Sequence, residues 1–264
     1  MNTAKGSVKQ IPRPYDPPQE HVYQKKEKKT IVFDSRETHF PKKKLILAAM
    51  PAYNEEKTIA KVILRTKKFV DHILVVDDGS TDATAEIAEA LGAYVIRHEK
   101  NKGYGSALQT IFKTARMIDA DALVILDSDD QHDPADIPSL LKTLNEGYDI
   151  IIGSRFIGNN GNRIPSYRIL GMKILDIATK LDGNIKLTDT QSGFRAYGKK
   201  AINSIRLSSD GMSAGSEILL QAKDHNLAIK EIPISVKYDV EKPSTQNPFA
   251  HGISVLGNII GIIG

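Results

Sequence analysis

Short apolar runs alternate with segments of helical spacing from residue 44 to residue 153, and this alternation constrains the fold more than any other feature. Strands are expected at 45–50, 73–76, 94–96, 122–126 and 150–152, and helices at 58–68, 82–91, 106–118 and 137–144. Alternation of this kind is typical of parallel strands joined by helical crossovers. The sequence therefore predicts an α/β fold with a mostly parallel central sheet flanked by helices.

Outside residues 44–153 the regular alternation of strands and helices weakens or is missing. After Gly153 we expect an amphipathic helix at 168–181, a strand at the end of 189–197, helices at 199–206 and 216–226, and a strand at 229–236. Prolines and lysines mark residues 1–41 as an N-terminal extension, which we interpret as a solvated arm rather than a lipid-binding one. Residues 42–240 then form the main domain, and 241–264 a loop with an apolar segment that is a candidate for contact with a membrane.

Composition excludes several classes of protein. The 264 residues include no cysteine, so disulfides, thiolate zinc sites and cysteine nucleophiles are ruled out. The net charge of +4 suits anionic partners such as phosphates or a membrane surface. We expect no nucleic-acid partner. We also expect no signal peptide and no spanning helix, because no run approaches the roughly 18 apolar residues that one needs.

Three of the expected strands end in unusually polar segments. They are PAYNEE at 51–56, DDGSTD at 77–82 and DSDDQHDP at 127–134. In parallel sheets, ligands bind beyond the carboxyl ends of the strands. The coincidence of three polar strand ends predicts a binding site at that edge of the sheet.

The segment DSDDQHDP predicts a metal site. Asp127 and Asp129 follow a buried strand, and carboxylates this close keep their charges only if a cation or hydrogen-bond donors compensate them. Together with Gln131 they offer oxygen ligands, which suit Mg²⁺ or Mn²⁺. The alternative is helix capping by Asp133 or Asp136, which explains one carboxylate but not the pair. His132 breaks the spacing of a calcium loop, and we interpret it as a residue outside the ligand set or a surface residue.

The other two strand ends suit a nucleotide. Asp77 or Asp78 could accept hydrogen bonds from a base or a ribose, while Ser80 and Asp82 could cap the following helix. In PAYNEE, Tyr53 could stack on the base and Glu55 could bind sugar or base.

The segment 101–107 opens a helix but has neither a dinucleotide-binding nor a P-loop spacing. Its helix N-terminus, with Lys102 nearby, could still hold an anion.

Taken in order, these segments resemble a known family. PAYNEEKTI, VVDDGSTDAT, NKGYGSAL and DSDDQHDP resemble the nucleotide-binding half of family 2 glycosyltransferases of the GT-A fold. IIGSRF, IPSYRILG, DTQSGFRAY and EIPISVKY are similar to the polyprenyl-phosphate branch, the dolichol-phosphate mannose, glucose or N-acetylglucosamine synthases. The resemblance implies a Rossmann-like nucleotide-binding half followed by an acceptor half.

The resemblance also implies roles for individual residues. The nucleotide-sugar set would be Pro51, Tyr53, Glu55, Asp77, Asp78, Lys102, Asp127 and Ser128. The metal set would be Asp127, Asp129 and Gln131. Arg155 and Arg168 would face the acceptor phosphate, Asp189 would lie near the donor sugar, and these three with Asp129 would form the catalytic set. Asp130 departs from the family, which often has glycine or leucine there; it either sharpens metal dependence or faces solvent.

The implied reaction is metal-dependent transfer of a hexose or N-acetylhexosamine, with inversion, from a UDP- or GDP-sugar to a polyprenyl phosphate. A phosphate monoester carries nearly two negative charges at pH 7, so it needs positioning rather than a general base. Asp189 is thus a sugar-positioning residue. The lipid acceptor implies a protein docked peripherally on the cytoplasmic face of a membrane, with 168–181 as one candidate surface.

Other hypotheses remain open. One is a family 2 transferase that acts on a polysaccharide or a soluble acceptor, which Arg155 and Arg168 disfavour. Another is a non-catalytic nucleotide-sugar sensor, which the Asp127/Asp129 pair disfavours. A sugar nucleotidyltransferase is disfavoured because its glycine-rich loop is missing. General similarity favours UDP-hexoses over GDP-mannose.

Overall fold

The structure, a computed structural model, describes residues 44–157 and 187–237. Its strands are β1 (Ile46–Ala52), β2 (His72–Asp77), β3 (Tyr94–Arg97), β4 (Ala122–Ile125), β5 (Ile150–Ser154), β6 (Arg195–Gly198) and β7 (Ile229–Pro233). Its helices are α1 (Ile59–Thr66), α2 (Thr84–Ala90), α3 (Tyr104–Met117), η1 (Pro134–Asp136), α4 (Ile137–Leu144), α6 (Lys199–Ser204) and α7 (Ala214–Asp224). The expected helix at 168–181, the arm at 1–41 and the segment 241–264 lie outside the described residues.

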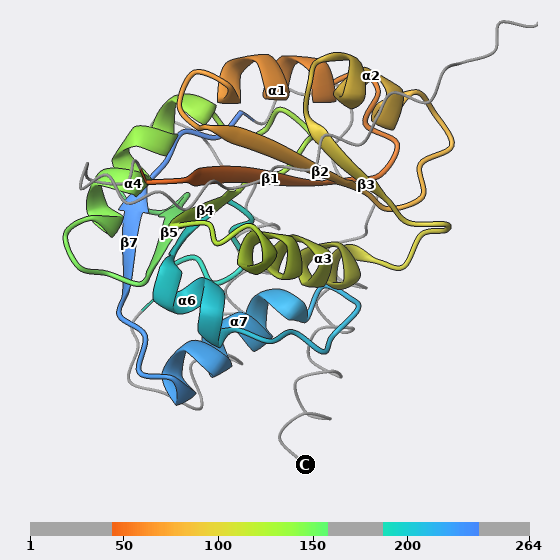
Figure 1. The fold of residues 1–264 in the computed structure, drawn as a ribbon. Coiled ribbons are helices and arrows are strands. Elements are labelled where there is room, and N and C mark those ends of the chain that lie inside the picture. Colours follow the sequence, from red (N-terminus) through yellow and green to blue (C-terminus); the bar gives the residue numbers. More distant parts are fainter. Residues whose placement is uncertain (1–43, 158–186, 238–264) are drawn as a thin grey trace, which may run out of the picture. The chain divides into compact units, whose positions relative to one another are not determined.

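The strands form one sheet in the order β3-β2-β1-β4-β6-β5-β7 (Figure 1). Only β6 runs antiparallel to its neighbours, β4 and β5, while the other described pairs are parallel. The predicted mostly parallel α/β fold is therefore confirmed. As a result, the carboxyl ends of β1, β2, β4 and β5 share one edge of the sheet.

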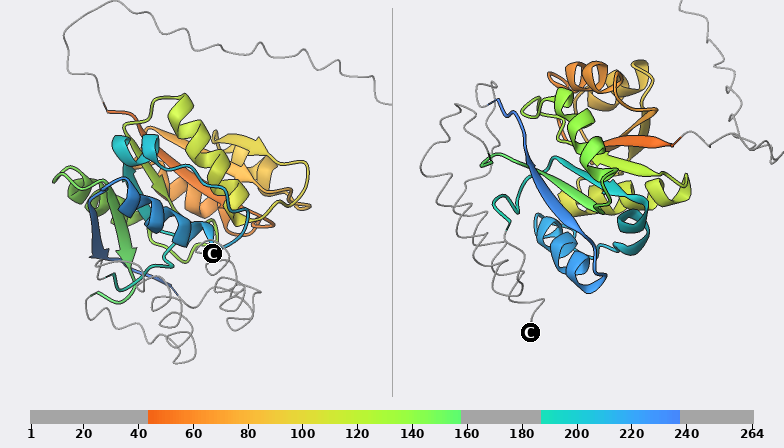
Figure 2. Two further views of the ribbon diagram at one scale, coloured as in Figure 1. Left: turned by 90° about the horizontal axis from the view of Figure 1, so that it is seen from below. Right: turned by 90° about the vertical axis from the view of Figure 1, so that its left-hand side faces the viewer.

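Alternation along the strands builds a separate core on each face of the sheet. In β1, Leu47 and Ala49 pack with α3, α6 and α7, while Ala48 and Met50 pack with α1, α2 and α4. All four side chains are buried. Helices cover both faces of the sheet, as the two views in Figure 2 show. Burial on both faces explains why these strands read as continuous apolar runs in the sequence.

A distant loop defines the start of α3. The helix begins at Tyr104 rather than at the expected residue 106. The Asp210 carbonyl accepts from the Gly105 N–H (2.8 Å) and the Ser106 N–H (3.3 Å), and the Asp210 carboxylate accepts from the Ser106 hydroxyl (2.8 Å). A Cβ at Gly105 would lie 2.1 Å from the Ser209 carbonyl oxygen, so glycine lets the two segments pack together.

Two other expectations differ in detail. The last strand ends at Pro233 rather than at 236, and Val236 instead forms an isolated bridge with His132. Ser80 does not cap α2, because its hydroxyl accepts from the Asn54 N–H (2.9 Å). Asp82 does accept from the Thr84 N–H (3.0 Å) at the start of that helix.

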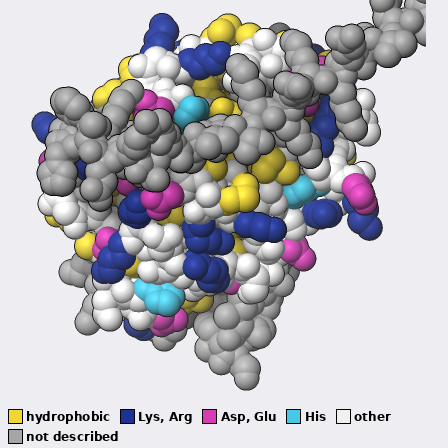
Figure 3. Space-filling view, in the orientation of Figure 1, with side chains coloured by type: hydrophobic (Ala, Val, Ile, Leu, Met, Phe, Trp, Pro, Cys, Tyr) yellow, Lys and Arg dark blue, Asp and Glu magenta, His cyan; other side chains and the backbone are white. Residues whose placement is uncertain are grey.

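The face that carries α3, α6 and α7 shows basic side chains gathered with acidic ones among them (Figure 3). On α6, Lys199 lies 3.2 Å from Asp121 and Lys200 lies 3.4 Å from Asp149. The positive charge of this helix is therefore partly compensated. Among the helices that the structure describes, none has the length and apolar character needed to cross a membrane.

Candidate active site

The predicted nucleotide and metal residues come together at the carboxyl edge of the sheet. Asp77 ends β2, Asp127 lies just beyond β4, and Arg155 lies just beyond β5. Because β2, β1 and β4 are neighbours in the sheet, the loops after them meet at this edge. The fold thus assembles side chains that are as many as 78 positions apart in the sequence.

The Asp127 carboxylate has no hydrogen-bond donor among the described residues. A third of its side chain is exposed (33%). Burial raises the pKa of Asp127, opposed by the charges of Arg155 and Arg195. The pKa of Asp129 is also raised, first by burial and then by the charge of Asp127. Asp129 does accept a hydrogen bond from the Gln131 N–H (2.9 Å). A cation between the two carboxylates would remove this electrostatic cost.

His132 and Gly193 enclose Asp127. The His132 ring is buried against Phe194, and its Nδ1 lies 3.5 Å from the nearer Asp127 oxygen without a hydrogen-bond partner. Burial lowers the pKa of His132, so the ring is neutral at pH 7. A Cβ at Gly193 would lie 2.5 Å from an Asp127 oxygen, so a larger residue there would displace the carboxylate. The interpretation of His132 as a surface residue is therefore wrong, and it belongs to the wall behind Asp127.

The donor set fits a hard divalent cation that a substrate completes. Asp127, Asp129 and Gln131 present oxygen ligands, which Mg²⁺ and Mn²⁺ prefer. Within residues 44–157 and 187–237, no group of three His, Asp or Glu side chains could form a protein-only metal cage. A site with few protein ligands leaves positions for water and phosphate oxygens, as Mg²⁺ sites usually do.

Asp130 does not face solvent, which corrects one of the two expectations for it, while its effect on metal dependence stays a prediction. Its side chain is buried (5% exposed), and its backbone has φ +60°. The carboxylate lies 2.6 Å from the Lys61 Nζ, 3.5 Å from the Arg65 Nη1 and 3.6 Å from the Lys237 Nζ. Asp130 therefore ties the Asp127–Asp129 loop to α1 on one side and to the chain after β7 on the other.

The two aspartates after β2 organise the loops around the predicted base site. Asp78 accepts from the Gly103 N–H (2.8 Å) and the Lys102 N–H (3.0 Å), and it lies 2.6 Å from the His98 Nδ1. Asp77 is buried and accepts from the Ser80 N–H (3.3 Å). Their role in binding a nucleotide stays a prediction, and the geometry adds a role in holding the 98–103 loop.

The loop after β1 contains both an exposed ring and fixed polar groups. Tyr53 is an exposed aromatic side chain (46%), as a stacking platform requires. The Ser128 hydroxyl donates to the Pro51 carbonyl (2.9 Å), which joins this loop to the Asp127–Asp129 segment. The Glu55 carboxylate accepts from the Thr58 hydroxyl (2.9 Å) before α1. Their contacts with a donor remain predictions.

The beginning of α3 leaves few N–H groups for an anion. The N–H groups of Lys102 and Gly103 bind Asp78, and those of Gly105 and Ser106 bind the Asp210 carbonyl. Any contact with a phosphate is therefore expected from the exposed Lys102 side chain rather than from the helix end.

Arg155 and Asp189 form one unit rather than two separate sites. The Arg155 Nε and Nη2 lie 2.6 and 2.5 Å from the two Asp189 carboxylate oxygens, and Asp189 is buried (1%). Glu231 of β7 in turn accepts from the Asp189 N–H (2.7 Å) and the Thr188 N–H (2.7 Å). Sequence reasoning missed Glu231, which lies inside the quoted EIPISVKY segment. The bidentate contact shows that Asp189 holds the Arg155 guanidinium in one orientation.

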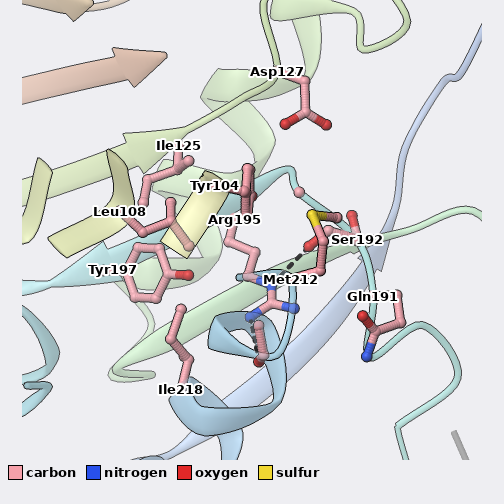
Figure 4. A pocket seen from close by; sticks show the side chains of 12 residues that line it. Tyr104, Leu108, Ile125, Asp127, Gln191, Ser192, Arg195, Tyr197, Met212 and Ile218 are labelled. Carbon is pink, nitrogen blue, oxygen red and sulfur yellow. Dashed lines mark hydrogen bonds between the residues drawn. The ribbon is translucent and has the colours of Figure 1, made fainter. Parts of the chain in front are cut away.

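A pocket beside Asp127 also contains residues that the sequence interpretation missed. Tyr104, Arg195 and Met212 line it together with apolar side chains (Figure 4). Arg195 is buried, and its guanidinium donates to the carbonyls of Ser192 and Thr190 (2.8 and 2.7 Å). An arginine at the start of the buried strand β6 was the available signal for this pocket.

The sheet order and the Asp127–Asp129 loop define a glycosyltransferase of the GT-A type. Residues 48–206 match the family described as Glycosyl transferase family 2. The chain therefore belongs to glycosyltransferase family 2, and it is an enzyme of that class.

Curated relatives and solved structures agree with this assignment. The UDP-N-acetylglucosamine–dolichyl-phosphate N-acetylglucosaminyltransferase of Methanococcus voltae is 34% identical over 235 residues, which cover 81% of this chain and 91% of the relative. The dolichyl-phosphate hexose transferase of Haloferax volcanii is 30% identical over 221 residues, covering 82% and 93%. Glucosyl-3-phosphoglycerate synthase of Mycobacterium tuberculosis, in complex with Mn²⁺ and UDP-glucose, has a TM-score of 0.61 at 25% identity, covering 83% of this chain and 80% of that one.

The Asp130 contacts give a prediction about stability. Asp130→Asn keeps a residue that tolerates positive φ but removes the charge that Lys61, Arg65 and Lys237 share. We expect the free energy of unfolding to fall by about 1–2 kcal/mol, less than for a fully buried pair because the cations are partly exposed. That corresponds to a drop in Tm of about 2–8 °C, measured by calorimetry.

Asp130→Gly is the matched control for backbone strain. Glycine suits the backbone at φ +60° better than aspartate does, but it also lacks the carboxylate. We expect Asp130→Gly to lose stability as well. If Asp130→Asn were as stable as the wild type, the ion pairs would contribute nothing, and Asp130→Gly would then report the backbone effect alone.

Proposed function

We propose that this enzyme transfers a hexose or N-acetylhexosamine, with inversion, from a nucleotide diphosphate sugar to a polyprenyl (dolichyl) phosphate, and that the transfer depends on Mg²⁺ or Mn²⁺. The observation that carries the proposal is the Asp127 carboxylate, which receives no hydrogen bond from a described residue, beside Asp129 at the sheet edge where α/β proteins bind nucleotides. A related fold that binds Mn²⁺ and UDP-glucose supports the metal and the donor.

Support for a polyprenyl phosphate as acceptor comes from the relatives and from the second half of the chain. Two relatives that align over most of their length are named for transfer to dolichyl phosphate. Arg155, held by Asp189, lies at the edge of the sheet where an acceptor phosphate would arrive. Arg168 is proposed as the second phosphate ligand from its sequence segment alone, because it lies outside the described residues.

Each residue of the site has a distinct part in the proposed reaction. Asp127 and Asp129 would hold a divalent ion at the diphosphate end of the donor, while Tyr53 and Asp77 would face the nucleoside. The bound ion would supply positive charge that stabilises the diphosphate leaving group. Arg155 orients the acceptor phosphate, whose own charge makes it the nucleophile. Asp189 keeps Arg155 in place. No general base is required, because the acceptor phosphate is already charged.

An isoprenoid acceptor also implies where the enzyme works. The lipid tail stays in the bilayer, and we propose that the enzyme docks peripherally on the cytoplasmic face of the membrane. The amphipathic segment 168–181 is the proposed contact. Transfer to a polysaccharide or soluble acceptor is the alternative, and the acceptor product distinguishes the two.

The first functional prediction concerns the metal. With polyprenyl phosphate, a radiolabelled UDP- or GDP-sugar and Mn²⁺, label should move into organic solvent, and EDTA should stop this transfer. Asp129→Asn should lower turnover about 100-fold or more, because an amide cannot replace the lost charge. The control Asp133→Asn should stay active, because asparagine also caps a helix. Full transfer in chelator would remove the metal from the mechanism, and label only in water-soluble product would remove the lipid acceptor.

A second functional prediction concerns the acceptor phosphate. Arg155→Lys and Arg168→Lys keep the charge but lose the planar fork that matches phosphate oxygens. Each should raise the acceptor KM about 10-fold, the scale of one charge-assisted hydrogen bond, while the donor KM stays within about twofold. Arg206→Lys, an arginine outside the site, should change neither constant.

The acceptor variants have a distinct structural alternative. If either arginine only stabilises the fold, its lysine variant should lower Tm and leave the acceptor KM unchanged. That result would withdraw the residue from the acceptor site.

A further inference from the structure

A small cavity lies next to Asp127, between α3, β4, β6 and α7 (Figure 4). Its volume is about 80 Å³. The lining side chains come from both halves of the chain: Tyr104, Leu108, Ile125, Arg195, Met212 and Ile218. None of the predicted roles uses this cavity.

The cavity joins an apolar wall to hydrogen-bond donors. Leu108, Ile125 and Ile218 are buried and present only hydrocarbon. The Tyr104 hydroxyl makes no hydrogen bond to any described residue. The Arg195 guanidinium gives three of its five N–H donors to backbone carbonyls, also contacts the Tyr197 hydroxyl, and forms no ion pair with a described carboxylate. Such a wall suits a group with a methyl at one end and a carbonyl oxygen at the other.

Size narrows the choice of occupant. A cavity of roughly 150 Å³ holds a benzene ring, and one water needs about 10–15 Å³. The 80 Å³ here is therefore too small for a whole sugar ring and too large for a single hydroxyl group. An acetyl group lies between these limits.

The cavity lies where the sugar of the donor is expected. Asp127, proposed to hold the donor diphosphate through the metal, forms one side of it. Gln191 also lines the cavity, and it follows Asp189, the residue that anchors Arg155. A sugar bonded to the outer phosphate would thus meet the cavity with a substituent close to its reacting carbon.

We propose that this cavity receives the acetamido group of an N-acetylhexosamine donor, with the methyl on the apolar wall and the carbonyl oxygen toward Tyr104 and Arg195. This inference rests on the proposed function and narrows its donor from any hexose to an N-acetylated one. A plain hexose would leave the cavity to water.

Gly215→Ala tests the cavity without disturbing the fold. A Cβ at Gly215 would lie 3.6 Å from the Arg195 Nη2, an ordinary contact, so the methyl reduces the cavity without a clash. Gly215 lies in α7, where alanine is favoured over glycine, so Tm should hold or rise. Gly211→Ala is the control, because its Cβ would meet nothing within 4 Å. Tyr104→Phe removes the hydroxyl alone.

The measurement is calorimetric binding, with Mn²⁺, of UDP-N-acetylglucosamine against UDP-glucose and of UDP-N-acetylgalactosamine against UDP-galactose. The wild type should bind the N-acetylated member of at least one pair about 10-fold more tightly or better, the effect of one well-made polar contact and a filled cavity. Gly215→Ala should reduce that preference to about twofold or less. It should do so by weakening the binding of the N-acetylated donor, while the affinity for the plain hexose donor stays the same. Tyr104→Phe should weaken the preference severalfold, and Gly211→Ala should keep it.

Other results overturn the inference in distinguishable ways. Equal affinity for both members of each pair, or a preference that Gly215→Ala leaves unchanged, would make the cavity a water site while the proposed function stands. If GDP-mannose were the only nucleotide sugar that binds, the inference about the cavity would likewise fail and the proposed function would stand. If no nucleotide sugar binds with Mn²⁺, the proposed function fails as well.

Discussion

Two closely spaced carboxylates at the end of a buried strand are the constraint on which the rest of this site depends. Asp127 and Asp129 repel each other in surroundings that hydrate them poorly, and burial raises the pKa of both. Hydrogen bonds from the described residues do little to offset this, since only Asp129 receives one. An enzyme keeps such a pair at a cost to stability, and a divalent cation with a diphosphate is the partner that would repay it.

The surrounding structure holds this strained loop from three sides. Gly193 lets the chain pass against Asp127, and Asp130 fixes the loop to α1 and to the chain after β7. The Lys237 N–H donates to the Gln131 carbonyl (2.9 Å), which adds a backbone link. The acceptor side is built in the same way, because Glu231 orients Asp189 and Asp189 orients Arg155. Rigid support of this kind lets a few side chains hold a charged substrate in one geometry.

The sequence predicted the sheet well because strands buried on both faces read as apolar runs, and parallel order follows from helical crossovers. Local signals could not predict contacts made across the fold. The start of α3 depends on Asp210, which lies far along the chain, and Asp130 finds its three cations on α1 and after β7. The Arg155–Asp189 pair was predicted as two separate roles, because spacing alone does not show that a carboxylate and a guanidinium meet. Arg168 keeps its predicted role without a structural test.

The central claim is that the carboxylate pair and a nucleoside diphosphate share one divalent ion. Mn²⁺ titrations followed by electron paramagnetic resonance, with and without UDP or GDP, test it most directly. The account predicts that one of these nucleotides tightens Mn²⁺ binding about 10-fold or more, and that Mn²⁺ tightens nucleotide binding by the same factor. Asp127→Asn should abolish this coupling while the protein stays folded. Nucleotide affinity that is the same with Mn²⁺ and with EDTA would contradict the account.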